Sequence, residues 1–275
     1  MKFIIQRIPY LLNKIHQSKF ANIGLSIFLE NLYAKFRKKD IKFLNDKKNK
    51  FIKAQSSIDK KYYPDKMRCF RLYRNGIAER GTSLFFSYCL DQINFNKNDI
   101  VVDCGANSGD LFIELKKYIK SKNYIAIEPN PEDFRSLNIN CKGARLINKA
   151  LGKTNSTSKF FINTTLADSS IIEPIKYDKV IDIEVVRLDY LMDLLKINSI
   201  KLLKVEAEGY EPEILKGAKS IFENIEYIAI DGGFERGKKA EQTFTLSSNF
   251  LINNNFEMID IGRKNLRALF KKKSN

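Results

Sequence analysis

The sequence predicts an α/β fold built on a doubly wound, mostly parallel sheet with an antiparallel edge, preceded by a basic helical extension. From about Asp99 onward, short apolar runs alternate with helical segments, as in βαβ units that place helices on both faces of a sheet. The charge also divides the chain. Residues 1–75 carry 19 Lys and Arg against 5 Asp and Glu, whereas residues 76–270 carry 26 against 27. We therefore expect an N-terminal extension over residues 1–75 and a main domain over residues 76–275.

The composition excludes several classes of protein. With 275 residues, of which 44% are hydrophobic, the chain has enough apolar material for a packed core, so global disorder is excluded. No run approaches the roughly 20 apolar residues that span a bilayer. The four cysteines form no C-x-x-C pair and there is a single histidine, which argues against a zinc site. We expect no metal site, and reduced thiols in a cytoplasmic protein.

The basic extension has two helical patterns, over residues 3–15 and 22–36, followed by a lysine-rich stretch over residues 35–61. Three interpretations remain open. The helices pack on the main domain with solvated lysines outside, or they form a peripheral surface for anionic lipid at a membrane, or they contact an anionic carrier or polymer, nucleic acid included. We expect His16 to lie on the helix surface.

The main domain is expected to alternate strand and helix throughout. Strands are predicted at 100–103, 124–128, 145–150, 200–206 and 225–231, and helices at 110–119, 131–140, 189–195, 211–222 and 242–251. An inserted pair of strands is predicted at 159–163 and 180–186. Residues 257–261 and 267–270 are expected to form a closing hairpin around Asn265, which gives the sheet its antiparallel edge.

The turn after the first of these strands, residues 103–110, is the first candidate site, because ligands of such sheets bind beyond the carboxyl ends of the strands. Its glycines allow the backbone to approach a ligand closely. Asp103 and Asp110 disfavour a pyrophosphate there and suit a ligand with a cationic portion. Gly105 and Gly109 are separated by three residues, so the G-x-G-x-x-G dinucleotide pattern is absent.

The end of the second strand adds a ribose site. Glu128 lies 23 residues after Gly105, where a carboxylate accepts hydrogen bonds from ribose hydroxyls. Asn130 follows, in a position to border an adenine. A nucleoside with a cationic tail and no phosphate is S-adenosylmethionine. The alternative for each piece alone is an ordinary turn with a capping acid.

These runs resemble the FkbM family of S-adenosylmethionine-dependent methyltransferases, over roughly residues 70–270. The resemblance rests on four blocks in the same order, at residues 103–109 with 128–131, 148–152, 187–189, and 204–218. It implies a class I methyltransferase (Rossmann-like) fold. It also implies cofactor contacts, at Asp103, Gly105, Asn107, Gly109 and Glu128. Asp168 and Ser169, in the polar loop after the third strand, are further candidates, with a plain loop as the alternative.

Methyl transfer requires an acceptor held in line with the sulfonium, and a hydroxyl acceptor must also lose its proton. Glu206 and Asp231, at the ends of the fourth and fifth strands, are the candidate catalytic carboxylates. Lys204 shares a face with Glu206 and is expected to pair with one of these two acids. Glu208 and Glu211 are expected to cap the next helix. Residues 232–237 are expected to form a mobile loop over the acceptor, with Arg236 either exposed or bound to an anionic group of the substrate.

Three functions follow from these observations. The first is O-methylation of a hydroxyl on a sugar, a glycan or another natural product. The second is methylation of nucleic acid, suggested by the basic extension, but no proline-aromatic platform follows the fourth strand and the chain has no Trp. The third is a non-catalytic module that binds S-adenosylmethionine. The first is preferred, so the expected partner is a small-molecule or glycan acceptor.

Overall fold

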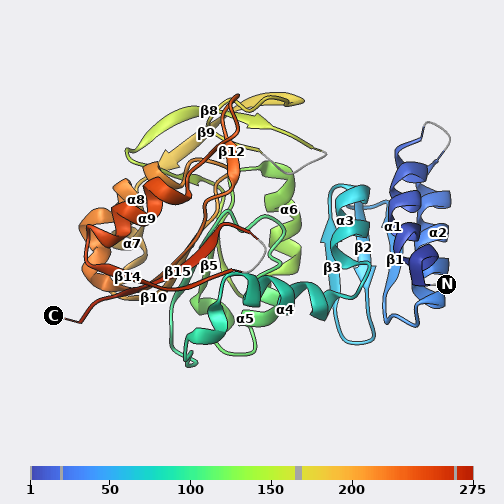
Figure 1. Ribbon diagram of the computed structural model, residues 1–275, viewed down its shortest axis with the longest axis horizontal. Helices are drawn as coiled ribbons and strands as arrows, with labels where there is room; N and C mark the ends of the chain where they lie inside the picture. Colours follow the sequence, from blue (N-terminus) through green and yellow to red (C-terminus); the bar gives the residue numbers. More distant parts are fainter. Residues whose placement is uncertain (1, 19–20, 165–168, 263–264, 275) are drawn as a thin grey trace. The chain divides into compact units, whose positions relative to one another are not determined.

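The computed structural model describes residues 2–18, 21–164, 169–262 and 265–274 (Figure 1). The chain divides into two compact units, Met1–Arg80 and Gly81–Asn275, here called unit 1 and unit 2. Each unit has secondary structure and buried side chains of its own, so each is described separately.

Unit 1 combines helices with a small antiparallel sheet. Its elements are α1 (Lys2–Gln17), α2 (Ile23–Phe36), β1 (Lys42–Asp46), β2 (Phe51–Gln55), β3 (Lys60–Tyr63) and α3 (Lys66–Tyr73), followed by α4 (Ile77–Ser87), which continues into unit 2. The two predicted helices are present, but a purely helical description is incomplete, because residues 42–63 form the sheet β1-β2-β3. Phe43, Ala54 and Tyr63 are buried on its inner face. Lysines alternate with these residues along the strands. A period of two is typical of a half-buried strand and is absent from a solvated helix face.

The predicted surface position of His16 is wrong. Its side chain is buried between α1 and the rest of unit 1, with Nε2 2.8 Å from Oε1 of Glu30. Arg74 completes the cluster by donating from Nε to Oε2 of Glu30 at 2.9 Å. Burial acts to raise the pKa of Glu30, but the hydrogen bonds from His16 and Arg74 hold it below its ordinary value. A buried carboxylate bonded by both His16 and Arg74 therefore joins the helices of unit 1.

Unit 2 is built on the predicted doubly wound sheet. Its strands are β4 (Val101–Cys104), β5 (Tyr124–Ile127), β6 (Arg145–Ile147), β10 (Ile200–Val205), β11 (Ile225–Asp231), β14 (Phe256–Ile261) and β15 (Arg267–Lys272). They lie in the order β14-β15-β11-β10-β4-β5-β6. β15 runs antiparallel to both neighbours, whereas β10 is parallel to β4 and β11. The reversed strand is therefore one position in from the edge, and β14 forms the edge itself.

Helices cover both faces of this sheet. Successive strand residues point to opposite faces, so Val101 and Leu202 contribute to one apolar cluster and Val102 and Leu203 to the other. One cluster contains side chains of α4, α5 (Phe112–Leu115) and α6 (Pro131–Asn140). The other contains side chains of α7 (Leu188–Leu195), α8 (Glu211–Ala218) and α9 (Phe244–Ile252). This is the layered arrangement of a class I methyltransferase domain.

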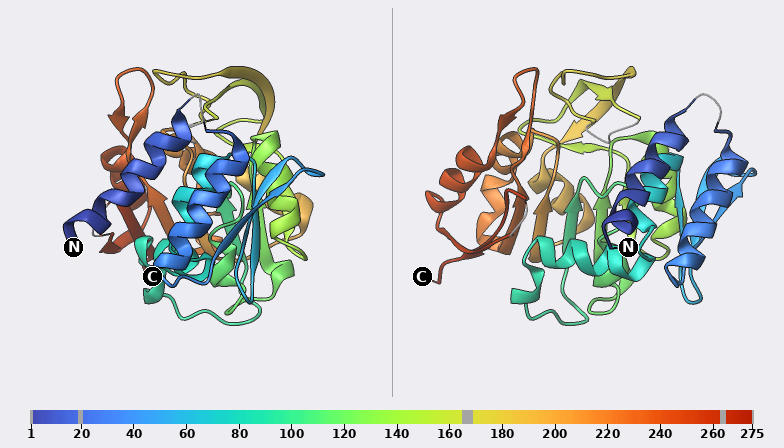
Figure 2. Two further views of the ribbon diagram at one scale, coloured as in Figure 1. Left: turned by 90° about the vertical axis from the view of Figure 1, so that its right-hand side faces the viewer. Right: turned by 45° about the vertical axis from the view of Figure 1, so that its right-hand side comes forward.

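Two smaller groups of strands stand outside the large sheet. The first contains β7 (Ala150–Leu151), β8 (Ser156–Ile162) and β9 (Lys179–Val186), drawn in green and yellow in Figure 2. The predicted strand over 145–150 is thus divided, since β6 ends at Ile147 and Ala150 pairs with β9. The second is the hairpin of β12 (Phe234–Arg236) and β13 (Glu241–Gln242). Short 3₁₀ helices lie at Leu90–Gln92, Ser121–Asn123 and Lys219–Asn224, the last continuing α8.

Two further expectations concern membrane spans and the state of the cysteines. Within the described residues, no helix combines the length and the apolar character needed to cross a membrane. The four cysteines, all of which are described, are buried and joined by no disulfide.

Candidate active site at the carboxyl ends of the strands

Four acids converge at one edge of the large sheet. Asp103 lies in β4, Glu128 follows β5, Glu206 follows β10 and Asp231 ends β11. β4 has β5 as its neighbour on one side and β10 on the other, so the strand order changes direction at β4. The four acids surround this switch point at the carboxyl ends of the strands. Ligands of doubly wound sheets bind at this point.

The turn after β4 requires its glycine at position 105. Gly105 has a φ of +76°, and a Cβ there would lie 1.9 Å from the backbone oxygen of Glu206. The amides of Gly105 and Ala106 both donate to the Ile127 carbonyl, at 3.0 and 3.1 Å. Asn107 also has a positive φ, +50°, which Asn adopts more readily than most residues. The Gly109 amide closes the turn by donating to the Ala106 carbonyl at 2.8 Å.

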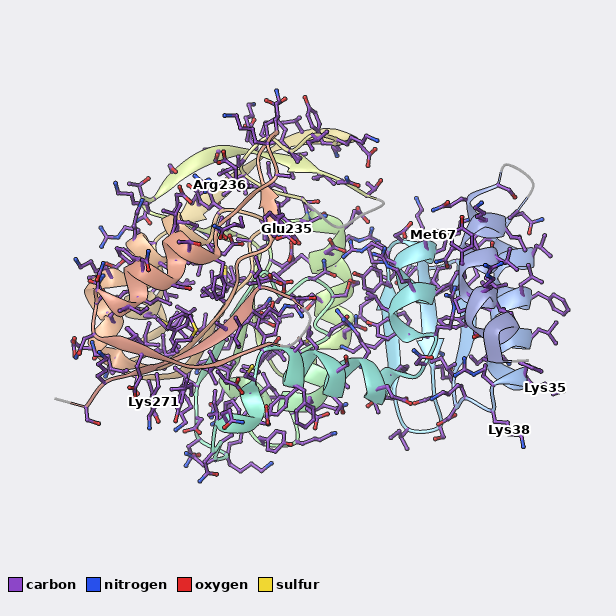
Figure 3. The ribbon with its side chains drawn as sticks, viewed as in Figure 1. Lys35, Lys38, Met67, Glu235, Arg236 and Lys271 are labelled. Carbon is purple, nitrogen blue, oxygen red and sulfur yellow. The ribbon has the colours of Figure 1, made fainter. Side chains whose placement is uncertain are left out.

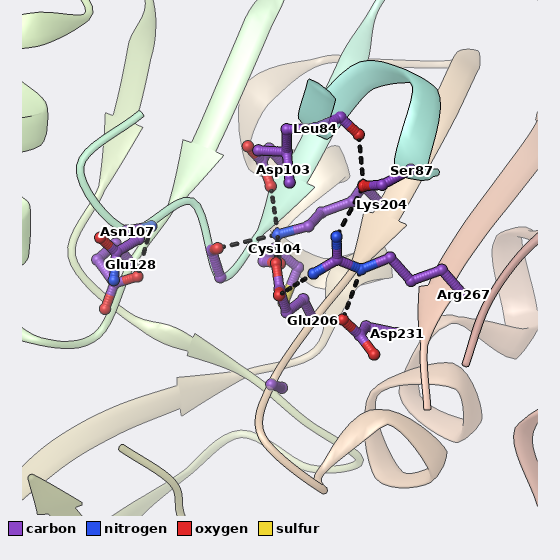
Figure 4. A network of polar contacts seen from close by, with 12 residues as sticks. Leu84, Ser87, Asp103, Cys104, Asn107, Glu128, Lys204, Glu206, Asp231 and Arg267 are labelled. Atoms are coloured by element: carbon purple, nitrogen blue, oxygen red, sulfur yellow. Dashed lines mark hydrogen bonds and ion pairs between the residues drawn. The ribbon is translucent and has the colours of Figure 1, made fainter. Parts of the chain in front are cut away.

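Glu128 is oriented by two backbone amides. Asn107 N–H donates to Oε2 and Asn130 N–H donates to Oε1, both at 2.8 Å (Figure 4). Burial and the nearby Asp133 carboxylate raise the pKa of Glu128 to about 8. Each carboxylate oxygen keeps a second lone pair after accepting one amide. The carboxylate thus fits a ribose, whose hydroxyls are donors, and donors would favour its ionised form.

Asn130 uses its side chain to begin helix α6. Its Oδ1 accepts the Glu132 amide at 3.1 Å, and its Nδ2 donates to Asp133 at 3.0 Å. Such bonds satisfy free amides of the first helical turn. Asn130 therefore fixes the direction of the chain just beyond Glu128.

Asp103 forms an ion pair beneath the turn. Its Oδ1 lies 3.0 Å from Nζ of Lys204, and its Oδ2 accepts the hydroxyl of Tyr124. Lys204 also donates to the carbonyls of Cys104 and Gly105, at 3.2 and 3.0 Å, and lies 2.8 Å from Glu206. The predicted pairing of Lys204 with Glu206 is present, and Asp103 is its second acidic partner. The ammonium thereby joins the ends of β4 and β10.

Arg267, from β15, connects the remaining two acids. Its guanidinium donates to Asp231 at 2.7 Å and to Glu206 at 3.2 Å, and it lies over the ring of Tyr88 at 4.4 Å (Figure 4). Burial opposes ionisation of Glu206, but the charges of Lys204 and Arg267 hold its pKa well below the usual range. The pKa of Asp231 is raised by burial and by the charge of Glu206. Glu206 is therefore a fixed anion.

A fifth acid, Glu235, faces this group from the β12–β13 hairpin. Burial, together with the charges of Asp231 and Glu206, raises the pKa of Glu235 to about 7. Its neighbour Arg236 binds elsewhere, donating to both oxygens of Glu213 at 2.8 and 2.9 Å. Figure 3 labels Glu235 and Arg236. Residues 234–236 of the expected loop over 232–237 thus form strand β12, and Arg236 is held by the protein itself.

Three other predicted positions remain, of which the structure describes Glu211 and Ser169. Glu211 accepts the amides of Ala207 and Gly209, at 2.7 and 3.1 Å, so it stabilises the turn before α8. Ser169 accepts the Asn163 amide at 3.0 Å within its own loop, and the adjacent Ser170 donates to the Glu208 carbonyl at 2.8 Å. Asp168 lies outside the described residues.

Sequence reasoning missed two residues of this site. Arg267 was assigned only to a closing strand, because its place beside Asp231 depends on the antiparallel register of β15 with β11. Glu235 was assigned to a loop. The sequence signal for Glu235 was the density of acids after the fourth and fifth strands, because closely spaced carboxylates raise the pKa of one of their number.

Among the described residues, no group of three or more His, Cys, Asp or Glu side chains is arranged to hold a metal ion.

Comparisons with known proteins agree with this geometry. A family model described as the methyltransferase FkbM domain matches residues 103–261, more than half of the chain. Methyltransferase sdnD of Sordaria araneosa is 26% identical over 170 residues, which cover 49% of this chain and 66% of that protein. Methyltransferase 1 of Beauveria bassiana is 24% identical over 178 residues, 54% of this chain and 72% of that protein. The chain thus spans just under two thirds of the first relative.

Solved structures give a more distant likeness. Fibrillarin of Aeropyrum pernix, solved with S-adenosylmethionine bound, has 9% identity and a TM-score of 0.41, over 68% of this chain and 73% of its own.

Proposed function

The chain belongs to the FkbM methyltransferase family, and we propose that it transfers the methyl group of S-adenosylmethionine to a hydroxyl oxygen of a sugar, a glycan or another natural product. S-Adenosylmethionine is the cofactor of this family, and it supplies an electrophilic methyl group on a sulfonium. The residues that would hold it are the turn of Gly105, Asn107 and Gly109, and the carboxylate of Glu128. The protein must then orient the acceptor oxygen and remove its proton.

The observation that carries the proposal is the group of acids at the carboxyl ends of the strands, where Asp231 and Glu206 lie close enough to Glu235 to raise its pKa, together with burial, to about 7. A general base works best when its pKa is close to the working pH. Glu206, held as an anion by two cations, binds a proton too weakly for this role. We assign proton removal from the hydroxyl to Glu235. Glu206 and Asp231, with Lys204 and Arg267, hold the strand ends in place around it.

The acceptor class can be tested directly. The full chain is incubated with S-adenosylmethionine and panels of hydroxylated sugars, glycans, primary amines and RNA. Production of S-adenosylhomocysteine is measured, and the position of the new methyl group is found by mass-spectrometric fragmentation. Methylated oxygen on a sugar or glycan supports the proposal. Methylated nitrogen, or methylated RNA, contradicts it.

Cofactor binding needs its own measurement, because binding without turnover would match the third function considered from the sequence. Calorimetric titration with S-adenosylmethionine and S-adenosylhomocysteine gives the two affinities. Binding of both, with no turnover on any panel, would identify a module without catalysis. Absence of binding would contradict the assignment of the turn and Glu128.

A further inference from the structure

Helix α2 of unit 1 has one side buried within the unit and an opposite side that is apolar and exposed. Its inner side buries Ser26, Glu30, Tyr33 and Ala34 within unit 1. Asn31 fixes the helix to β1, donating to the Phe43 carbonyl at 3.0 Å and accepting the Phe43 amide at 2.7 Å. The core of unit 1 is therefore complete without the opposite side of the helix.

That opposite side carries four large apolar residues, here called the α2 stripe. They are Leu25, Phe28, Leu32 and Phe36, with exposed fractions of 41%, 62%, 55% and 62%. Their spacing of three, four and four residues places them on one face of the helix. Scattered exposed apolar residues are ordinary, but a continuous row marks an interaction site. The neighbouring helix α1 also exposes Tyr10, Leu11 and Ile15.

Positive charge surrounds the α2 stripe. Lys35 and Lys38 are exposed at the end of α2 and project from the same end of the helix in Figure 3. On α1, Lys14 lies 4.8 Å from the centre of the Tyr10 ring. Residues 1–75 as a whole have 14 more Lys and Arg than Asp and Glu. An apolar row beside basic side chains is the pattern of a helix that lies in the interface of an anionic membrane.

We propose that the α2 stripe inserts into the headgroup region of an anionic lipid bilayer, with Lys35 and Lys38 on the lipid phosphates. Two other occupants fit less well. A second copy of the chain would bring two strongly basic surfaces together, which is repulsive. Nucleic acid would use the lysines and stack on Phe28 and Phe36, but it would leave the aliphatic Leu25 and Leu32 without a partner, whereas a bilayer takes all four. α2 has 14 residues, too few to span a bilayer, so it lies along the surface.

Insertion can be measured with a single introduced tryptophan, because the chain has no Trp of its own. In the variant Phe28→Trp, insertion predicts a blue shift of the emission and quenching by brominated lipid, in vesicles that contain phosphatidylglycerol. The matched control is Phe86→Trp, in unit 2, where the original side chain is 56% exposed. The control should show neither change. If Phe28→Trp shows neither change with anionic vesicles, the proposal is overturned.

The contributions of apolar contact and charge are then separated by vesicle sedimentation. The triple variant Phe28→Gln/Leu32→Gln/Phe36→Gln and the pair Lys35→Gln/Lys38→Gln should each bind anionic vesicles about tenfold or more weakly. Leu194→Gln/Leu246→Gln and Lys216→Gln/Lys219→Gln, which change exposed residues of unit 2, should bind as the unaltered protein does.

Three results contradict the proposal. If the triple variant binds anionic vesicles as tightly as the unaltered protein does, charge alone adsorbs the protein to the vesicle surface. RNA that competes away the vesicles and also shifts the Trp emission would make nucleic acid the occupant. A dimer in light scattering that the triple variant dissociates would make it a second copy. The residues proposed for methyl transfer all lie in unit 2, so loss of vesicle binding with unchanged turnover of a soluble acceptor separates this proposal from the proposed function.

Discussion

Arg267 and Asp231 face each other across two antiparallel strands, and the guanidinium donates to the carboxylate at 2.7 Å. The same guanidinium reaches Glu206 and the hydroxyl of Ser87, at 3.2 and 2.7 Å. One side chain of β15 thus neutralises the acids that end β10 and β11. Without it, Lys204, which also pairs with Asp103, would be left to balance both Glu206 and Asp231.

Arg267→Met should strongly destabilise unit 2. Removing one partner of a buried ion pair leaves an uncompensated charge and costs about 3–5 kcal/mol. Urea denaturation followed by circular dichroism measures the change. Arg135→Met, which breaks the exposed pair with Glu132, should cost no more than about 1 kcal/mol. If both variants lose the same small amount, the Arg267 network does not stabilise the sheet edge.

Glu235→Gln should lower kcat by roughly 10²–10⁴-fold, because the amide cannot take the proton of the acceptor. In the unaltered enzyme, kcat should rise with pH through about 7, where the Glu235 carboxyl loses its proton, and level off above it. Affinity for S-adenosylmethionine should stay unchanged. The control Glu241→Gln alters an exposed acid of the same hairpin. A pH profile that is unaltered in Glu235→Gln would contradict the assignment.

Affinity for a ribose-containing ligand should depend on Glu128. Its pKa is raised to about 8, so the carboxyl is protonated below that pH, whereas ribose hydroxyls bind the ionised form. Affinity should therefore rise with pH up to about 8, by at most about tenfold per unit. Adenosine is the suitable probe, because it has no amino group that titrates in this range. Calorimetry should show no such rise for Glu128→Gln. A flat profile in the unaltered protein would remove Glu128 from the ribose site.

Gly105→Ala should abolish cofactor binding. The added Cβ would lie 1.9 Å from the Glu206 carbonyl oxygen, and a φ of +76° adds strain of about 1–3 kcal/mol. The turn must move, which displaces the Asn107 amide that helps to orient Glu128. Gly24→Ala is the control, since its Cβ meets only the Asn22 side chain at 3.3 Å. Titration with S-adenosylhomocysteine compares the two. Normal affinity in Gly105→Ala would show that the turn tolerates movement.

Glu30→Gln should loosen unit 1. The variant removes the anion that His16 and Arg74 share, at an expected cost of about 3–5 kcal/mol. Folding lowers the pKa of Glu30 from its ordinary value of 4.5, so this stabilisation is present above pH 4.5 and is lost as the pH falls through the lowered pKa. Hydrogen exchange of the α2 and α3 amides measures both effects. Glu79→Gln, which alters an exposed pair with Lys39, should leave their protection unchanged.

The strands and turns of unit 2 were predictable because their signals are local. β4, β10 and β11 are apolar runs that end at acids, and the turn at Gly105 is defined by its glycines. Arg267 and His16 were not predictable, because their partners are 36 and 14 residues away and only the packing brings them together. The sheet of unit 1 was missed for another reason. The lysines around Phe43, Ala54 and Tyr63 give this stretch the composition of a solvated surface, which conceals the period of two.

The position of β15 has a consequence for the order in which the site is assembled during translation. Glu206 and Asp231 leave the ribosome before Arg267, and the guanidinium reaches them only when β15 inserts between β11 and β14. Until then the nascent sheet has an open edge beside two acids that repel each other. Insertion of one late strand therefore completes the sheet and neutralises the carboxylates together. A ribosome stalled before residue 267 would hold a chain that has the turn at Gly105 but not the finished site.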